Sequence, residues 1–324
     1  MPDLLVVSRA MTPLMRQILE PHFTIHALFE QPDREAWLNA HGAKIDMVLT
    51  DGHWGLRPEV GRHLPNLRMV SCFGVGYDNI DATALAARGI VVTHTPDVLN
   101  AEVANTAILL WLATARRLVR DDRFVREGRW KDGSAPLTHS VDGRRVGILG
   151  LGRIGLELAR RLAVFDGEIA YHSRNERTDV PYRYYPRLVD MAQDVDVLFC
   201  MTPGGEATRH LVNGDVIDAL GPDGILINVA RGSVVDEAAL VAALQDGRLG
   251  GAGLDVFEAE PQVPETLFGM ENVTLLPHVG SATVETRRAM GDLACRNLVL
   301  FLTEGRVVSP VPECRDIARL EAAG

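Results

Sequence analysis

Short apolar runs alternate with amphipathic stretches along the whole chain. A first group of runs lies at residues 4–8, 23–27, 47–50, 68–73 and 90–95, and a second group lies at 146–149, 168–172, 195–201, 224–229, 253–256 and 273–276. Each run has the length and composition of a strand buried on both faces, and each is followed by a segment that can cross back as a helix. The pattern therefore predicts an α/β fold with parallel sheets.

Two long helical patterns divide the chain between these groups. The helix expected over 101–119 separates the two groups of strands, and the helix expected over 284–303 follows the second group. Two doubly wound parallel-sheet domains result. Because the last helix precedes a tail with Pro310 and Pro312, we expect it to return to the first group. The first domain then comprises residues 1–98 and 284–324, and residues 99–283 form the inserted second domain.

Composition narrows the class of protein. The 324 residues exceed what one core usually holds, and 47% of them are hydrophobic, which suffices for two cores. A net charge of −10 argues against nucleic acid or an anionic membrane as a partner. Arginines cluster between residues 116 and 126, but acidic residues interleave with them, which is typical of a solvated or subunit-facing helix.

The cysteines and the chain's start indicate a cytoplasmic location. The four cysteines show neither paired nor metal-ligand spacing, and Cys72 and Cys200 lie in apolar runs. We therefore expect reduced, buried thiols and no metal site. The segment that begins at Met1 has no basic stretch typical of a signal peptide, and no apolar run approaches the ~18 residues of a membrane span.

The run from Val146 to Gly155, Val-Gly-Ile-Leu-Gly-Leu-Gly-Arg-Ile-Gly, is a dinucleotide fingerprint. A buried strand opens directly into glycines, and an amphipathic helix follows over about 154–163. Gly150 permits the tight turn, Gly152 leaves room for a pyrophosphate, and Gly155 lets the helix pack closely on the strand. The amides at the start of that helix then face the phosphates.

The end of the next strand indicates which nucleotide is bound. An NAD site usually places Asp or Glu there, about 20 residues past the glycines, to bind the ribose hydroxyls. This chain has Ser173 and Arg174 instead, which suit a 2′-phosphate because the guanidinium grips it and the hydroxyl donates another bond. The sequence therefore favours NADP(H). The alternative is that Arg174 and Arg177 are solvated loop charges.

Three polar residues follow strands of the second domain, where open α/β sheets bind ligands. Arg231 follows the run 225–230, Glu260 follows 255–259, and His278 follows 275–277. A 2-oxo acid needs an arginine for its carboxylate and carbonyl oxygen, and a protonated imidazole that donates a proton as hydride arrives. Glu260 would bind the other ring nitrogen and stabilise the protonated ring.

Each of these residues also has a structural interpretation. His278 could cap a loop, Arg231 could start the helix near Val235, and Glu260 could be a turn acid before Pro261. Taken together, and beside a phosphate-binding loop, they favour catalysis. Among the remaining histidines, His172 lies near the expected ribose site and His53 near a glycine-rich turn, and we expect the others at the surface.

Several motifs in order resemble the D-2-hydroxyacid dehydrogenase family. They are the fingerprint 150–155 and the segments Asn228-Val-Ala-Arg-Gly-Ser-Val-Val-Asp-Glu237, Gly253-Leu-Asp-Val-Phe-Glu-Ala-Glu-Pro261 and Leu276-Pro-His-Val-Gly-Ser281. The chain looks most similar to the branch of NADP(H)-linked glyoxylate/hydroxypyruvate and hydroxyphenylpyruvate reductases, whose second strand also ends in Ser-Arg. The resemblance implies a flavodoxin-like substrate domain and a Rossmann nucleotide domain.

The resemblance also assigns roles to individual residues. It implies that Arg231, Glu260 and His278 are catalytic and that Asp255 binds the carboxamide of the cofactor. The segment 73–81 matches the family's substrate loop, so the amides of Val75 and Gly76 would hold the substrate carboxylate; a turn that caps the helix near Asp81 is the structural interpretation. Further implied contacts are Ser281 at the substrate and Arg153, Ile154, Thr202, Pro203, Val229 and Gly280 at the cofactor.

The family resemblance further implies a homodimer built on 101–129, with Trp130 near the partner's active site. With about 20 residues after the last helix, we expect no regulatory domain of the phosphoglycerate dehydrogenase kind, and Glu260 replaces the glutamine of formate dehydrogenases. Trp54 could close on a small acid or stack on an aromatic one, so glyoxylate, hydroxypyruvate and an aromatic pyruvate all stay open as substrates. A nucleotide-sensing co-repressor is the non-enzymatic alternative, by fold analogy alone.

Overall fold

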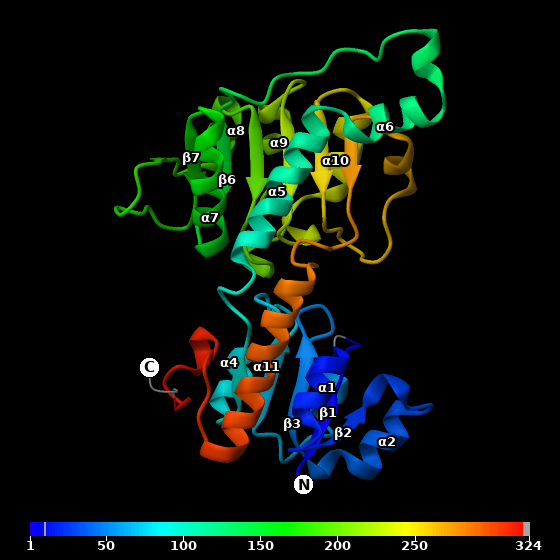
Figure 1. The fold of residues 1–324 in the computed structure, drawn as a ribbon. Coiled ribbons are helices and arrows are strands. Elements are labelled where there is room, and N and C mark those ends of the chain that lie inside the picture. The colour runs from blue at the N-terminus through cyan, green and yellow to red at the C-terminus, as the bar shows by residue number, and fades with distance from the viewer. Residues whose placement is uncertain (10, 320–324) are drawn as a thin grey trace. The chain divides into compact units, whose positions relative to one another are not determined.

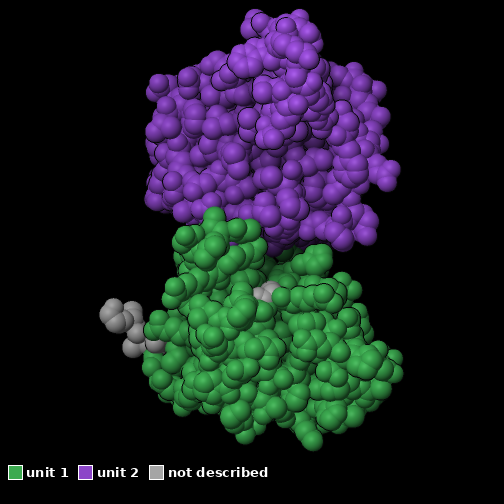
Figure 2. All heavy atoms as spheres, turned by 45° about the vertical axis from the view of Figure 1, so that its right-hand side comes forward, with its two compact units in different colours: residues 1–99, 282–324 green, residues 100–281 purple. Residues whose placement is uncertain are grey.

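A computed structural model describes residues 1–9 and 11–319. The chain forms two compact units, which Figure 2 shows in different colours. Unit 1 comprises residues 1–99 and 282–324, and unit 2 comprises residues 100–281. Each unit has its own parallel sheet and its own buried core.

The sheet of unit 1 has five parallel strands in the order β2-β1-β3-β4-β5. The strands are β1 (Asp3–Val6), β2 (Thr24–Ala27), β3 (Ile45–Asp51), β4 (Met69–Phe73) and β5 (Val91–Thr93). This is the flavodoxin-like strand order, and it confirms the doubly wound sheet predicted from the first group of apolar runs.

Helices cover both faces of this sheet. They are α1 (Pro13–Leu19), α2 (Arg34–His41), α3 (Pro58–Gly61), α4 (Ala82–Ala87) and α11 (Val284–Glu304). α11 packs beside α1 and against β4 (Figure 1). The last helix therefore returns to the first group of strands, as its position in the sequence predicted. The following segment adds Val311 and Cys314 to the core on the opposite face.

The sheet of unit 2 has seven parallel strands in the order β12-β11-β10-β9-β6-β7-β8. The strands are β6 (Val146–Leu149), β7 (Ile169–His172), β8 (Arg183–Tyr184), β9 (Val197–Cys200), β10 (Ile225–Asn228), β11 (Gly251–Leu254) and β12 (Val273–Leu275). Counted from β6, this is the Rossmann order with one further strand.

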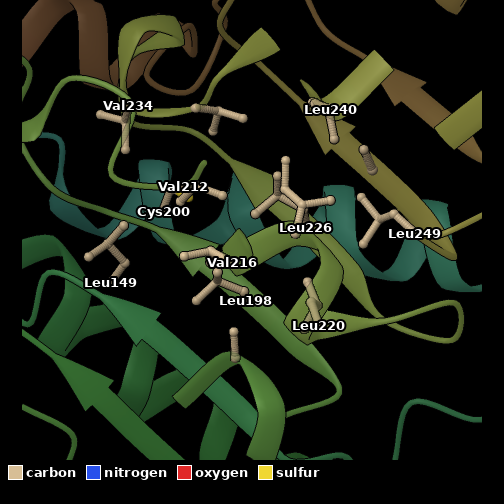
Figure 3. Packing of buried hydrophobic residues seen from close by; sticks show 14 of the residues in the cluster. Leu149, Leu198, Cys200, Val212, Val216, Leu220, Leu226, Val234, Leu240 and Leu249 are labelled. Atoms are coloured by element: carbon tan, nitrogen blue, oxygen red, sulfur yellow. The ribbon is translucent and has the colours of Figure 1, made fainter. Parts of the chain in front are cut away.

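The two faces of this sheet pack against different helices. Its helices are α5 (Asn100–Ala115), α6 (Leu118–Arg126), α7 (Arg153–Leu162), α8 (Leu188–Asp194), α9 (Gly214–Leu220) and α10 (Glu237–Gln245). Leu198 and Leu226 join the core made with α8, α9 and α10 (Figure 3). Phe199, the next residue on β9, instead meets Trp111 of α5 at a ring distance of 5.9 Å. Side chains on a strand alternate in this way, so both faces are buried.

The structure differs from the sequence prediction in two elements. The helix expected over 101–119 is divided into α5 and α6, because Arg117 takes a left-handed backbone conformation with φ of 52°. The Arg117 guanidinium donates to the carbonyl of Gly250, 133 positions away, so a tertiary contact accompanies the break. The prediction also lacks β8, a two-residue strand at the sheet edge that pairs only with β7.

Across residues 1–9 and 11–319, none of the helices has the length and hydropathy that a membrane span requires. In the same described part of the chain, we find no cluster of three or more metal-ligating side chains. All four cysteines are buried, which confirms the expectation of buried thiols.

The burial of the thiols leads to a chemical prediction. Loss of hydration raises the pKa of Cys200 and of Cys295 to about 12, so the reactive thiolate is scarce in the native state. We expect none of the four thiols to react with Ellman's reagent at pH 8 until the protein is unfolded in guanidinium chloride, when all four should react. Rapid stoichiometric reaction of a native thiol would contradict this burial.

Candidate active site

Three predicted site residues follow neighbouring strands of unit 2. Arg231 lies three residues after β10, Asp255 follows β11 directly, and His278 lies three residues after β12. These strands are adjacent in the order β12-β11-β10. Because parallel strands end at the same edge of a sheet, the three residues lie at one edge, where doubly wound folds bind ligands.

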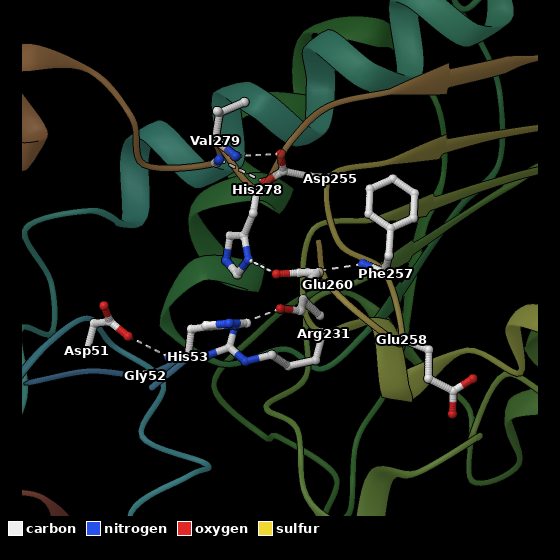
Figure 4. Close-up of polar contacts among 12 residues, drawn as sticks. Asp51, Gly52, His53, Arg231, Asp255, Phe257, Glu258, Glu260, His278 and Val279 are labelled. Carbon is white, nitrogen blue, oxygen red and sulfur yellow. Dashed lines mark hydrogen bonds and ion pairs between the residues drawn. The ribbon is translucent and has the colours of Figure 1, made fainter. Parts of the chain in front are cut away.

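His278 and Glu260 form a hydrogen-bonded pair at this edge. The distance between His278 Nδ1 and Glu260 Oε2 is 2.8 Å, and Glu260 Oε1 accepts the backbone N–H of Phe257 at 3.0 Å. The Glu260 side chain is 19% exposed and the His278 side chain 43% exposed. Glu260 is thus fixed by Phe257 and bonds to Nδ1 of the ring, so Nε2 of His278 takes no part in this bond (Figure 4).

Arg231 extends from the turn after β10 toward the same place. Figure 4 shows its guanidinium on the side where the His278 ring and the Glu260 carboxylate lie. Asn228, at the end of β10, holds this turn because its amide donates to the Arg231 carbonyl at 3.0 Å and its oxygen accepts the Ala230 N–H at 3.0 Å. The neighbouring Glu258 pairs instead with Arg209 and His210.

Asp255 holds the segment that carries His278. Its two carboxylate oxygens accept the backbone N–H groups of Val279 at 2.7 Å and Gly280 at 2.8 Å, and its own carbonyl accepts the N–H of His278 at 2.8 Å. His278 has a φ of 55°, which a residue with a side chain adopts only when its surroundings enforce it. Three consecutive hydrogen bonds to one residue provide that enforcement.

The carboxylate of Asp255 is almost completely buried, with 1% of the residue exposed. Burial raises the pKa of Asp255 above its usual range, and the N–H groups of Val279 and Gly280 oppose that shift. A side chain at Gly280 would crowd this carboxylate, because a Cβ at this position would lie only 3.0 Å from Asp255 Oδ2. The sequence resemblance assigned Asp255 to the cofactor; the structure adds that both of its oxygens already bind the protein.

The glycine-rich turn after β6 contains three glycines in three different environments. Gly150 has a φ of 98°, and a Cβ there would lie 2.9 Å from the amide nitrogen of Thr202. A Cβ on Gly155 would lie 2.2 Å from the Gly150 carbonyl oxygen, so only glycine lets α7 approach the turn. Next to Gly152, by contrast, there is open space. A pyrophosphate placed at the start of α7 fits this arrangement.

The end of β7 places two basic side chains in different settings. Arg177 pairs with Asp179 at 2.6 Å and donates to the Leu151 carbonyl at 3.2 Å, so it belongs to the loop itself. Arg174 is exposed, and within the described residues its guanidinium has no ion-pair partner. Ser173 Oγ accepts the Leu151 N–H at 3.0 Å, which places the hydroxyl against the glycine-rich turn. Ser173 and Arg174 can therefore hold a phosphate beside that turn.

The remaining cofactor residues implied by the resemblance lie along the same edge of unit 2. Arg153 and Ile154 begin α7, Thr202 and Pro203 follow β9, and Val229 follows β10. Ser281 ends unit 2 directly after Gly280. The structure thus gathers all the predicted nucleotide contacts at the carboxyl ends of one sheet.

The predicted substrate loop of unit 1 follows β4. Val75 and Gly76 are partly exposed, and in the described chain their backbone N–H groups donate to no protein acceptor. The turn after β3 lies beside this loop, because the Asn79 amide donates to the carbonyls of Gly52 at 3.1 Å and His53 at 2.8 Å. Trp54, on the same turn, is 37% exposed.

Sequence reasoning missed two residues that support these loops, Asn228 and His94. Asn228 lies within a motif that we quoted, but no pattern reveals that its amide holds the Arg231 turn. His94 was expected at the surface, and this expectation is wrong, because it is only 8% exposed. It follows β5 directly and bonds to the backbone of residues 75 and 309, which are distant in sequence.

The geometry of Asp255 predicts the effect of replacing it with Asn. Asn keeps one acceptor oxygen but puts an NH2 group opposite either Val279 N–H or Gly280 N–H, so one buried bond is lost. We expect Asp255→Asn to lower the free energy of unfolding by about 1–3 kcal/mol and to lower kcat by loosening His278. Thermal unfolding and steady-state kinetics would measure both effects, and unchanged stability and kcat would contradict this role.

The chain is similar to known proteins over most of its length. The family model described as "D-isomer specific 2-hydroxyacid dehydrogenase, NAD binding domain" matches residues 108–280. The chain is 48% identical over 301 residues to glyoxylate/hydroxypyruvate reductase A of Arabidopsis thaliana, covering 93% of this chain and 96% of that protein. It is 46% identical over 301 residues to hydroxyphenylpyruvate reductase of Plectranthus scutellarioides, with the same coverage of each chain.

A solved structure is similar over nearly the full length. It is the crystal structure of an NADPH-dependent glyoxylate/hydroxypyruvate reductase from Sinorhizobium meliloti in complex with NADP and malonate. The TM-score is 0.92 with 47% sequence identity, and the match covers 99% of each chain. These comparisons confirm the family that the sequence motifs indicated. The chain belongs to the D-isomer specific 2-hydroxyacid dehydrogenase family.

Proposed function

We propose that this chain uses NADPH to reduce a small 2-oxo acid of the glyoxylate or hydroxypyruvate type to the D-2-hydroxy acid. The observation that carries the proposal is the cluster of His278, Glu260 and Arg231 at the edge of a sheet that also bears the glycine-rich turn. Similarity to glyoxylate/hydroxypyruvate reductases supports the substrate class. Similarity to a hydroxyphenylpyruvate reductase makes an aromatic 2-oxo acid the alternative.

His278 is the proposed proton donor. Glu260 accepts from Nδ1, so Nε2 is the ring atom that can give its proton to the substrate carbonyl oxygen. The carboxylate stabilises the protonated ring that donation requires, and Asp255 fixes the backbone below it. When bound, the dinucleotide supplies the hydride that reaches C2 of the substrate.

The negative charge of the substrate needs its own partners. Arg231 can bind the carboxylate and the carbonyl oxygen together, because a guanidinium presents paired N–H groups in a fixed plane. The unsatisfied N–H groups of Val75 and Gly76 are the proposed second set of donors to the carboxylate, and Ser281 is a further proposed contact. Under this proposal, residues 1–98 and 284–324 form the substrate domain and residues 99–283 the nucleotide domain.

The turn after β6 and the end of β7 fit NADP(H). Open space at Gly152 would receive the pyrophosphate beside the first amides of α7, with contacts from Arg153, Ile154 and Gly155. Ser173 and the unpaired Arg174 would bind the 2′-phosphate. Thr202, Pro203, Val229, Asp255 and Gly280 are the proposed further contacts of the cofactor.

We further propose a homodimer that uses the region around α6, and a cytoplasmic location. α6 has no buried residue, and several large apolar side chains near it are exposed: Leu118, Val119, Val125, Trp130 and Leu137. A second copy of the chain would cover this surface. Four buried thiols are typical of a reducing compartment.

Replacement of His278 tests the proposed chemistry. With NADPH and either glyoxylate, hydroxypyruvate, pyruvate or phenylpyruvate, the wild type should consume NADPH and form the D-hydroxy acid. His278→Ala should lose at least ~10²-fold in kcat, since a positioned acid contributes that much. The ranking of kcat/KM over the four acids separates the small-acid proposal from the aromatic alternative.

His210→Ala is a matched control for His278→Ala. His210 also bonds to a glutamate, at 2.9 Å from Glu258, and also has a positive φ, of 50°. Since we assign it no role in the reaction, this variant should retain wild-type turnover. Near wild-type kcat in His278→Ala would refute the assignment of the proton donor.

Replacement of Arg174 tests the choice of nucleotide. Arg174→Ala should raise the KM of NADPH and leave that of NADH nearly unchanged, because only NADPH offers a 2′-phosphate. Charge-assisted bonds of this kind are worth about 1.5–3 kcal/mol, so discrimination should fall roughly tenfold to a hundredfold. Adding Ser173→Asp should invert the preference, since a carboxylate repels the phosphate and accepts from ribose hydroxyls.

Arg177→Ala provides the contrast within the same loop. Arg177 bonds to the Leu151 carbonyl, so its loss should weaken both nucleotides alike. A wild type that uses NADH as well as NADPH would show that Arg174 does not select the cofactor.

A further inference from the structure

A hydrogen bond joins the His94 side chain to the proposed carboxylate-binding loop, residues 73–81. His94 Nδ1 lies 2.9 Å from the carbonyl oxygen of Val75. A backbone carbonyl can only accept a hydrogen bond, so Nδ1 must carry the proton and act as the donor. The carbonyl of Val75 therefore fixes the His94 ring in a form that carries a proton on Nδ1.

This bond orients the peptide that carries the Gly76 N–H. The carbonyl of Val75 and the N–H of Gly76 belong to one peptide group, which is planar and trans, so they point in opposite directions. When His94 holds the carbonyl on one side, the N–H is turned to the other side. In the described chain that N–H has no protein acceptor, which leaves it available to a ligand.

His94 is itself held rigidly. Its backbone N–H donates to the Ser309 carbonyl at 3.1 Å, and its carbonyl accepts the Ser309 hydroxyl at 2.7 Å. Ser309 is bound in turn by Asn297, which is fully buried in α11 and contacts both the hydroxyl and the N–H of Ser309. The edge-to-face ring contact with Tyr77, with centroids 5.5 Å apart, completes the setting of the imidazole.

Other contacts fix the rest of the loop but not this peptide. The Thr95 N–H donates to the Gly74 carbonyl at 2.8 Å, and the Cys72 thiol lies 3.6 Å from the Gly76 carbonyl. The Tyr77 hydroxyl donates to Glu313 at 3.0 Å. Gly74 and Tyr77 are thus anchored on either side, while within the described residues His94 holds the peptide group between Val75 and Gly76.

We propose that His94 is a positioning residue for the substrate carboxylate: its Nδ1–H aims the Gly76 N–H at the 2-oxo acid. This inference rests on the proposed function, in which the Gly76 amide binds that carboxylate. It adds a residue that acts through the Gly76 N–H and that influences affinity for the acid and not for the nucleotide.

Two substitutions at position 94 separate the donor from the bulk of the ring. Asn can place its side-chain NH2 where Nδ1–H lies, whereas Leu fills a similar space without any donor. Loss of one neutral hydrogen bond corresponds to about a 3- to 10-fold change. We expect His94→Leu to raise the KM of the 2-oxo acid by that factor, while the KM of NADPH stays within about twofold.

Oxalate provides a binding readout that does not depend on turnover. Its dissociation constant in the presence of NADP should rise by the same factor in His94→Leu. His94→Asn should remain within about twofold of the wild type in both measurements, because it restores the donor. Equal KM values for the acid in the wild type and His94→Leu would overturn the inference.

A control separates positioning from general destabilisation. Val48 is fully buried in β3 of the same unit. Within the described residues, it makes no hydrogen bond to residue 75 or 76. Val48→Ala should lower the thermal stability without a selective rise in the KM of the acid. If Val48→Ala and His94→Leu raise that KM equally, the role of His94 is structural only and the inference is refuted.

The same experiments distinguish failure of the proposed function. If the wild type reduces none of the 2-oxo acids with NADPH, the proposed function fails, and this inference fails with it. If the wild type is active and binds oxalate, but His94→Leu changes neither the KM of the acid nor the dissociation constant of oxalate, only the proposed role of His94 is wrong.

Discussion

The edge of unit 2 that carries His278 depends on the buried carboxylate of Asp255. Its oxygens bind the N–H groups of two consecutive residues, and its carbonyl binds a third. This arrangement offsets part of the cost of burying a charge, because each oxygen receives a backbone donor. It also holds His278 in a left-handed conformation that an isolated chain would avoid. The position of the imidazole is therefore a consequence of burying an acid next to β11.

Glu260 and Asp255 together determine the position of the His278 side chain. Asp255 fixes the backbone at His278, and Glu260 fixes the ring at Nδ1, so two carboxylates position one side chain by different means. The two acids do not compete for the same role, because Asp255 is buried and accepts backbone N–H groups while Glu260 is partly exposed and bonds to the imidazole. An acid placed in this way can keep a ring oriented before any substrate arrives, which is the form of preorganisation that general acid catalysis needs.

The sequence predicted those features that depend on local pattern. Runs of apolar residues located the strands, and the glycine spacing located the turn after β6, because both have local physical causes. The break between α5 and α6 could not be predicted, since Arg117 meets the carbonyl of Gly250 far along the chain. The burial of His94 was missed for the same reason: its backbone pairs with Ser309, 215 positions away. Side chains whose surroundings come from distant segments leave no periodic signal.

The two units use hydrogen bonding in a similar way at the ends of their strands. In unit 2 a carboxylate gathers N–H groups and thereby turns the His278 segment. In unit 1 an imidazole N–H binds a carbonyl and thereby turns the Gly76 N–H. In both cases a buried side chain sets the direction of a backbone group, and loops that follow parallel strands can then present precise donors without long regular structure. A substitution at such a side chain changes the direction of a backbone donor, and so the geometry of the site, even where the side chain itself does not contact the ligand.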